Sequence, residues 1–300
     1  MISLSVLEEA MYTAMKTAVL RIPPDIERAM KKAYKEETSE LARMHLAMFF
    51  ENVRLASDGK GLVCGDTGYP LYFLKAGRNC RIEGGFGEAR HSAEKITARL
   101  TDEAYLRPTM VDPIRRINPG NNVGPGMPKV ELSFEGEGDR LEIIAAPKGG
   151  GSEIFGTFYK MMYPSDGLTG IKMFVLDCIK DSCYAGKICP PAIIGVGIGG
   201  TADLCMGLAK KAALLRPIGS FNKDKKIAKL EKEFLEAARK LGIGPMGSSG
   251  INAVVGLHIE TAYTHTAALP VAFNAQCMVG RRWKAIVAPD GKIEYTGDIA

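Results

Sequence analysis

Three cysteines constrain the fold of this chain most, because each lies beside residues that redirect the backbone. Cys64 stands in V-C-G-D-T-G, Cys189 in I-C-P-P and Cys277 in Q-C-M-V-G-R-R. A cysteine that only fills a core usually lies inside an apolar helix or strand and needs no such neighbours. A fold that brings these three turns together would place three thiolates at one point, as an iron–sulfur cluster requires. Three ligands would leave one iron of a four-iron cluster open to substrate.

The other four cysteines are predicted to be structural. The total of seven is odd and shows no small-scaffold spacing, which argues against a secreted disulfide framework and favours a reducing, cytoplasmic setting. Cys183 is the rival to Cys189, since it stands only six residues earlier. Proline after Cys189 fixes a turn that can present a thiolate, whereas Cys183 is expected on a helix. We therefore prefer Cys189 and treat Cys80, Cys178, Cys183 and Cys205 as structural.

Net charge and hydropathy indicate which kinds of ligand and which cellular setting suit this chain. The net charge of +5 is spread over the 300 residues, which suits a small anionic substrate and argues against nucleic acid. No run of eighteen apolar residues is present, so no transmembrane helix is expected. The first twenty residues carry two early acidic side chains and lack a basic region with a cleavage site. They are predicted to form a helix and not a secretory signal.

Periodicity predicts interleaved helices and strands. Apolar spacing predicts helices over residues 3–57, interrupted at Pro23 and Pro24, and a further helix at 92–106 that closes at L-R-P. Residues 70–76 are predicted to form a strand, and the runs KVELSFE and RLEIIAA are predicted to form a hairpin. Later elements are expected at 169–184 (helix), 192–200 (strand), 201–215 (helix capped by Thr201) and 222–241 (helix).

This pattern predicts an α+β, or mixed α/β, fold. A helical N-terminal region is expected to precede a sheet-and-helix domain of two lobes. Residues 1–300 would form one catalytic domain, with a boundary between the lobes near 118–150, where the breaker-rich loop N-P-G-N-N-V-G-P-G-M-P begins.

The segment G-V-G-I-G-G at 195–200 matches a dinucleotide-binding fingerprint, since it ends a strand and opens a helix. That fingerprint also needs an acidic residue at the end of a second strand about 20 positions later. Here Asp224 stands in a basic loop instead. A tight strand-to-helix turn is therefore preferred, and a nicotinamide-dependent dehydrogenase is kept as an alternative.

Two further groups of residues are candidates for chemistry. Gly149, Gly150 and Gly151 could let backbone N–H groups approach a carboxylate beside Lys148, although a flexible turn is the simpler interpretation. Asp66, two residues after Cys64, and His265, twelve before Cys277, could exchange a proton. His258 competes with His265, but its apolar neighbours predict a buried strand position.

Taken together, C-G-D-T-G, A-P-K-G-G-G-S, I-C-P-P-A-I-I-G-V-G-I-G-G-T, H-T-A-A-L-P-V-A-F-N-A-Q-C and the closing G-R-R resemble a class I fumarase. More narrowly, the chain is similar to the α subunit of the two-subunit fumarase and L-tartrate dehydratase group. The resemblance runs from about residue 5 to residue 290 with the same order of motifs. The combination is specific, whereas each motif alone is not.

The resemblance implies a [4Fe–4S] cluster held by Cys64, Cys189 and Cys277, with substrate on the fourth iron. It also implies that Asp66 and His265 are the acid–base pair. A base and further cationic clamps would come from a separate β subunit. The family predicts an α2β2 assembly with contact between the two α subunits.

The resemblance implies substrate-binding roles as well. Arg107 would pair with a substrate carboxylate, and the glycine turn would be Gly149, Gly150 and Gly151. Gly65 departs from the family, which usually has glutamine between the first cysteine and Asp66. That glutamine touches substrate, so the departure bears on which dicarboxylate binds.

The predicted activity is the reversible dehydration of a C4 hydroxy-dicarboxylate, with malate to fumarate preferred. L-tartrate dehydration to oxaloacetate is the alternative within the same class. A non-catalytic iron–sulfur scaffold or sensor is the alternative outside it. It would need none of Asp66, His265 and Arg107, and no β partner.

Overall fold

A computed structural model describes residues 1–299, and its backbone contacts divide the chain into two compact units. Unit 1 contains residues 1–23, 52–150 and 281–299, and unit 2 contains residues 24–51 and 151–280. Each unit has a mixed sheet covered by helices, so the predicted mixed α/β fold with a helical N-terminal region is confirmed. Over residues 1–299, no helix combines the length and the apolar character needed to cross a bilayer.

The N-terminal region consists of three helices: α1 (Leu4–Leu20), α2 (Pro24–Glu36) and α3 (Glu40–Ser57). The predicted break at Pro23 and Pro24 is confirmed. Pro24 is the first residue of α2, a position where a missing N–H costs nothing. A second break, over residues 37–39, was not predicted.

Glu37 causes this second break. Its buried carboxylate accepts hydrogen bonds from the backbone N–H groups of the next two residues and of a distant segment. Oε1 accepts from Thr38 N at 2.8 Å, Ser39 N at 3.3 Å and Ile251 N at 3.0 Å. Oε2 accepts from Asn252 N at 3.1 Å and Asn252 Nδ2 at 2.9 Å. Burial alone would raise the pKa of Glu37, but these hydrogen bonds outweigh it and the pKa is lowered.

Glu37→Gln should lower the free energy of unfolding at pH 7 by about 2–3 kcal/mol, because hydrogen bonds to a charged acceptor are lost. The folded pKa lies below the unfolded value, so the carboxylate stabilises the fold above the unfolded pKa. That stabilisation disappears as pH falls through the folded pKa, where wild type and variant should converge. Urea unfolding at pH 7 and at acidic pH measures this, with exposed Glu40→Gln as the control. A difference that persists in acid would contradict the account.

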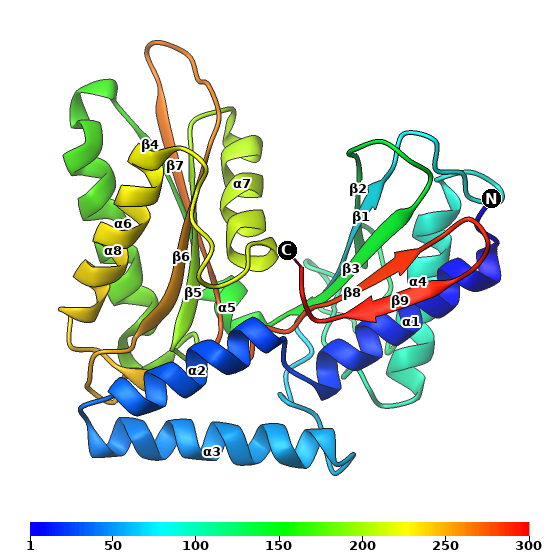
Figure 1. Cartoon of the computed structure of the whole chain (residues 1–300), viewed down its shortest axis with the longest axis horizontal. Coiled ribbons are helices and arrows are strands. Elements are labelled where there is room, and N and C mark those ends of the chain that lie inside the picture. The colour runs from blue at the N-terminus through cyan, green and yellow to red at the C-terminus, as the bar shows by residue number, and fades with distance from the viewer. Residues whose placement is uncertain (300) are drawn as a thin grey trace. The chain divides into compact units, whose positions relative to one another are not determined.

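Unit 1 is built on a five-stranded sheet covered on one face by α1 and by α4 (Glu88–Asp102), as Figure 1 shows. The strand order is β2-β1-β3-β8-β9. Side chains from both helices and the sheet form one apolar core. The strands are β1 (Tyr69–Ala76), β2 (Lys129–Phe134), β3 (Leu141–Lys148), β8 (Trp283–Val287) and β9 (Ile293–Thr296).

Two expectations for unit 1 were wrong. β2 and β3 do not form a hairpin, because β1 lies between them, parallel to β2 and antiparallel to β3. β1 is apolar and buried along most of its length, which suits an interior strand with a neighbour on each side. The helix expected to close at L-R-P ends at Asp102, since the N–H groups of Tyr105 and Leu106 both return to Leu100 O and close the turn earlier.

Unit 2 is a three-layer structure around a four-stranded sheet of order β4-β7-β5-β6. Figure 1 shows α6 (Gly167–Cys183) and α8 (Lys225–Arg239) on one face and α7 (Ala202–Leu215) on the other. The strands are β4 (Thr157–Met162), β5 (Ala192–Ile198), β6 (Val254–Thr261) and β7 (Leu269–Gln276). The helices and the strand predicted between residues 169 and 241 are confirmed, with ends shifted by a few residues. Thr201 stands at the N-cap position of α7, but its hydroxyl donates to Asp203 Oδ1 at 2.6 Å and caps no backbone N–H.

Close packing explains the glycines of G-V-G-I-G-G. A Cβ at Gly195 would collide with Ala209 O, and one at Gly197 would collide with Cys205 O, both on α7. Asp224 caps α8 by accepting from Lys226 N at 2.7 Å, so it is not the acidic end of a second strand. These contacts favour the tight strand-to-helix turn over the dinucleotide fingerprint.

Candidate functional site

In unit 1, Asp66 joins two of the predicted site segments. Its Oδ1 accepts from Gly68 N at 2.9 Å, which closes an Asx turn within C-G-D-T-G. Its Oδ2 accepts from Gly150 N at 2.5 Å. The N–H of Gly150 is therefore already engaged by Asp66, and residues Gly150–Ile154 form the short helix α5.

Gly68 makes this approach possible. Its φ is +64°, and a Cβ there would collide with Lys148 O at the end of β3. Only glycine combines that backbone conformation with that contact. The fourth residue after Cys64 thus fixes where the carboxylate of Asp66 meets the backbone of Gly150.

Arg107 is exposed and is held from both sides by residues that the sequence did not single out. Its N–H donates to Thr67 Oγ1 at 2.5 Å, and its carbonyl accepts from Asn122 Nδ2 at 2.8 Å. Its Nη1 donates to Gly65 O at 2.9 Å. The guanidinium therefore lies beside the Cys64–Gly68 segment, with donors left over for a carboxylate.

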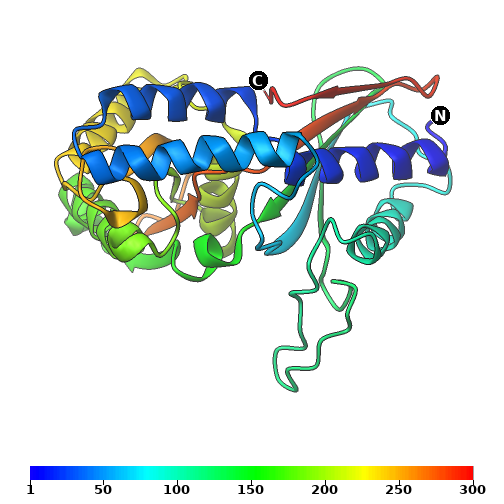
Figure 2. The ribbon, with the colours of Figure 1, turned by 90° about the horizontal axis from the view of Figure 1, so that it is seen from below.

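Asn122 is the residue that orders this region, and sequence reasoning missed it. It is fully buried in the long connection between α4 and β2, the teal loop in Figure 2. Its Oδ1 accepts from Thr109 N at 2.8 Å and Met110 N at 3.1 Å. Its φ of +60°, which asparagine tolerates better than most residues, was foreshadowed only by the N-N pair in a breaker-rich loop.

In unit 2, Cys189 and Cys277 belong to paired segments. Met278 N donates to Cys189 O at 3.1 Å, and β5 and β7 pair with Ile193 opposite Gln276. Cys189 is exposed and has a φ of +53°, which is uncommon for a residue other than glycine. Such a conformation persists where the surroundings impose it, and it is frequent at functional sites.

The four remaining cysteines have environments that suppress the thiolate. Burial raises the pKa of Cys178 and Cys183 to about 12 and that of Cys205 to about 11. It also raises the pKa of Cys80. Cys183, the rival to Cys189, ends α6 within the core of unit 2. A buried apolar thiol of this kind is a poor metal ligand.

Iodoacetamide at pH 8 should modify Cys189 in the cluster-free protein well before these four thiols. A pKa of about 12 leaves roughly one Cys183 side chain in 10⁴ as thiolate at that pH, and burial blocks access as well. Peptide mapping by mass spectrometry with time gives the order, and Cys189→Ser should remove the earliest of these adducts. Equal labelling of Cys183 and Cys189 would contradict the assignment.

His265 lies on the exposed loop 262–268 that precedes β7. Its Nδ1 accepts from Ala267 N at 3.2 Å, so the neutral ring carries its proton on Nε2. His258 is on β6 and buried, as its apolar neighbours predicted. Of the two histidines, His265 is therefore the one accessible to a substrate.

The structure brings the predicted residues together in two sets. Unit 1 holds Cys64, Asp66, Arg107, Gly149 and Gly150, whereas unit 2 holds Gly151, Cys189, Cys277 and His265. Within residues 1–299, no three His, Cys, Asp or Glu side chains are grouped so that they could hold a metal ion. The three-thiolate set and the pairing of Asp66 with His265 therefore stay predictions.

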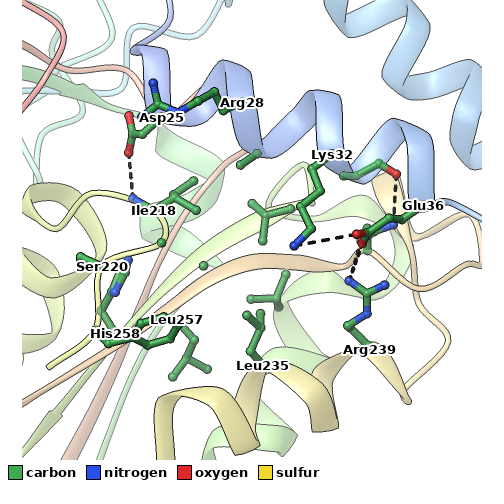
Figure 3. A pocket seen from close by; sticks show the side chains of 18 residues that line it. Asp25, Arg28, Lys32, Glu36, Ile218, Ser220, Leu235, Arg239, Leu257 and His258 are labelled. Atoms are coloured by element: carbon green, nitrogen blue, oxygen red, sulfur yellow. Dashed lines mark hydrogen bonds and ion pairs between the residues drawn. The ribbon is translucent and has the colours of Figure 1, made fainter. Parts of the chain in front are cut away.

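A cavity of about 400 Å³ lies within unit 2 and is lined by α2, α8 and β6 (Figure 3). Three of its charged side chains pair with one another. Glu36 pairs with Arg239 at 3.0 Å and with Lys32 at 3.8 Å, and Asp25 accepts from Ile218 N at 2.9 Å. None of the predicted catalytic or ligand residues lines it.

Comparison with known proteins agrees with these motifs. A family model described as fumarate hydratase (Fumerase) matches residues 8–286. A Methanocaldococcus jannaschii protein, provisionally named L(+)-tartrate dehydratase subunit alpha, is 42% identical over 96% of this chain and 99% of its own. The L(+)-tartrate dehydratase subunit alpha of Escherichia coli K12 is 34% identical over 94% of this chain and 90% of its own. The resemblance inferred from the motifs is confirmed, and this chain belongs to the class I fumarate hydratase family of hydro-lyases.

Proposed function

We propose that this chain is the α subunit of an iron–sulfur hydro-lyase that reversibly dehydrates a C4 hydroxy-dicarboxylate together with a separate β subunit. The observation that carries this proposal is the environment of Cys189. It is an exposed cysteine in a left-handed conformation, and its backbone is bonded to the residue that follows Cys277. The names of the relatives as α subunits support the separate β subunit.

The chemistry of the donor residues supports a [4Fe–4S] cluster as the group that this chain would hold. Cys64, Cys189 and Cys277 would supply thiolates, whereas burial raises the pKa of each of the four other cysteines. Arg281, four residues after Cys277, is a buried cation whose guanidinium lacks a hydrogen-bond partner in residues 1–299, which suits a neighbouring anionic group. When bound, the cluster would supply Lewis-acid activation of the substrate hydroxyl.

The chain's own residues would orient the substrate. Arg107 can grip one carboxylate with the guanidinium donors that Gly65 does not use. Thr67 and Asn122 already fix the backbone on both sides of Arg107, so little ordering remains to be done when substrate binds.

Asp66 and His265 would act together as the general acid that protonates the departing oxygen. Two backbone N–H groups fix the carboxylate of Asp66, while His265 presents Nε2–H because its Nδ1 is an acceptor. To act as the acid, the ring would take up a second proton on Nδ1, pass its Nε2 proton to the leaving hydroxide and return to the neutral form, with the Asp66 carboxylate stabilising the imidazolium before the transfer. The proton on the neighbouring carbon would pass to a base of the β subunit, giving an alkene and water.

Two substrates deserve equal testing. Malate dehydration to fumarate is the activity preferred from the motifs, and L-tartrate dehydration to oxaloacetate is favoured by the names of the relatives. Gly65 has no side chain beside Arg107, so a substrate with an additional hydroxyl would find more room there than in a site with glutamine.

The α chain and its β partner, co-produced and purified without oxygen, should convert at least one of these substrates without added nicotinamide. The α chain alone should be inactive, and light scattering should find an α2β2 assembly. A cluster-loaded assembly that converts neither substrate would refute the hydro-lyase proposal. Activity that depends on nicotinamide would favour a dehydrogenase.

Gly65→Gln should change the ratio of kcat/KM for malate and L-tartrate by about tenfold, the effect of one hydrogen bond gained or lost. A Cβ at residue 65 would lie 4.0 Å from Arg107 Nη1, so the new amide would stand beside the carboxylate-binding group. The backbone of Gly65 has no positive φ, so stability should be preserved. Gly61→Gln, at an exposed position with open space, is the matched control. An unchanged ratio would remove Gly65 from the substrate site.

A further inference from the structure

Arg281 is buried, and the described residues of the chain provide no hydrogen-bond acceptor for its guanidinium. The side chain is 1% exposed, and Nε, Nη1 and Nη2 are all buried without a hydrogen-bond partner in residues 1–299. Arginine keeps its charge in proteins and carries five N–H donors. A buried cation with no partner is strongly unfavourable, so this position calls for an anion that does not come from the described residues.

Another arginine illustrates how this chain normally treats such a charge. Arg216, in unit 2, donates to Glu231 Oε1 at 2.6 Å, and the Glu231 side chain is fully buried. Arg216 also reaches Glu260 Oε1 at 3.2 Å. The lack of any such carboxylate at Arg281 therefore marks this residue as different within the part of the chain that the structure describes.

Arg281 follows directly after a tight turn that begins at Cys277. Gly280 N donates to Cys277 O at 3.0 Å, so residues 277–280 form a closed turn and Arg281 follows at once. A Cβ at Gly280 would collide with Ile26 Cδ1, and its φ is +48°, so this turn is tightly packed. The guanidinium thus belongs to the segment that carries a predicted thiolate ligand.

We propose that Arg281 is a positioning residue that provides the buried counter-charge and N–H donors for the iron–sulfur cluster. This inference rests on the proposed function. A cluster of iron, sulfide and three thiolates is net anionic and stays in the protein. A substrate carboxylate leaves after each turnover, and the buried guanidinium of Arg281 would then have no counter-ion. Hydrogen bonds and positive charge near cluster sulfur atoms raise the reduction potential and strengthen retention.

Cluster-loaded wild type, Arg281→Lys and Arg281→Met, each with the β partner, test this proposal. Iron and sulfide content, release to a ferrous chelator and the anaerobic reduction potential are the readouts. Arg281→Met should release iron about 10–100-fold faster, the usual effect of losing a residue that supports a metal ligand, and have a lower potential. Arg281→Lys, which keeps the charge but loses the fork of donors, should fall between the two.

Urea unfolding of the cluster-free α chain gives a second readout with the opposite sign. There the charge of Arg281 is uncompensated, so Arg281→Met should raise the unfolding midpoint above wild type. Arg216→Met is the control and should lower the midpoint, because it strands buried Glu231.

The outcomes are separable. Unchanged iron release and potential in Arg281→Met, with a lowered midpoint of the cluster-free chain, would make Arg281 an ordinary structural cation and overturn the inference. A change confined to KM would assign it to a substrate carboxylate and overturn it too. In both cases a loaded wild type leaves the proposed function intact. A wild type that takes up no cluster would overturn both.

Discussion

Cys189→Ser is expected to lower the dehydratase activity of the anaerobic α–β enzyme by about 10³-fold or more. Loss of a residue that merely supports a metal ligand costs 10–100-fold, and loss of the ligand itself should cost more. The Cys189 thiol is exposed, so serine at this position should leave the packing of the core unchanged. Iron content should fall together with activity, while the urea midpoint of the cluster-free chain should stay near wild type.

Cys183→Ser is the matched control for that experiment. Cys183 stands six residues earlier, but it is fully buried in the core of unit 2. Serine there should cost about 1–2 kcal/mol of stability, because a hydroxyl replaces an apolar thiol. Iron content and kcat should be retained. Full turnover by Cys189→Ser, or iron loss caused by Cys183→Ser, would reverse the ligand assignment.

Asp66→Asn is expected to reduce kcat by about 10²–10⁴-fold, the range that a positioned acid or base contributes. The amide still offers one oxygen to Gly68 N or Gly150 N, but it can neither hold a proton nor stabilise a charged imidazole. KM for the dicarboxylate should change little, because Arg107 remains in place.

Asp66→Ala separates this chemistry from a purely structural role. Alanine removes both acceptors of Asp66, so it should destabilise the α chain more than asparagine does. If Asp66 acts on the proton, the two variants should be similarly inactive despite their different stabilities. Activity that follows stability, with Asp66→Asn close to wild type, would assign the carboxylate to holding the glycine turn.

The sequence predicted most of the elements because their signals are local. Apolar spacing located the N-terminal helices, and Pro24 at the start of α2 fixed one boundary. Pairing was less predictable, since β2 and β3 are neighbours in sequence yet separated by β1 in the sheet. A strand that is buried along its length competes for the interior place, and this competition depends on the whole sheet.

Breaks and loop anchors depended on partners far away in the chain. The end of α2 is set by Glu37, whose acceptors meet the backbone of Ile251 and Asn252. Asn122 orders the loop that carries Arg107, and only its tolerance of positive φ could be foreseen. Neither residue has a neighbouring pattern that would mark its role.

The candidate site was predictable where the residues that form a turn are adjacent in the sequence. C-G-D-T-G places the carboxylate of Asp66 two residues before Gly68, and in the structure this carboxylate closes an Asx turn. The buried state of Arg281 could not be read from G-R-R, because adjacent arginines usually face solvent and burial is decided by tertiary packing.

Iron anomalous diffraction from anaerobic crystals of the α–β assembly would test the central claim most directly. The account predicts one four-iron site bonded to the sulfur atoms of Cys64, Cys189 and Cys277, with the fourth iron free of protein sulfur. Iron bound by a different set of cysteines, or bonded to only one of these three, would contradict it.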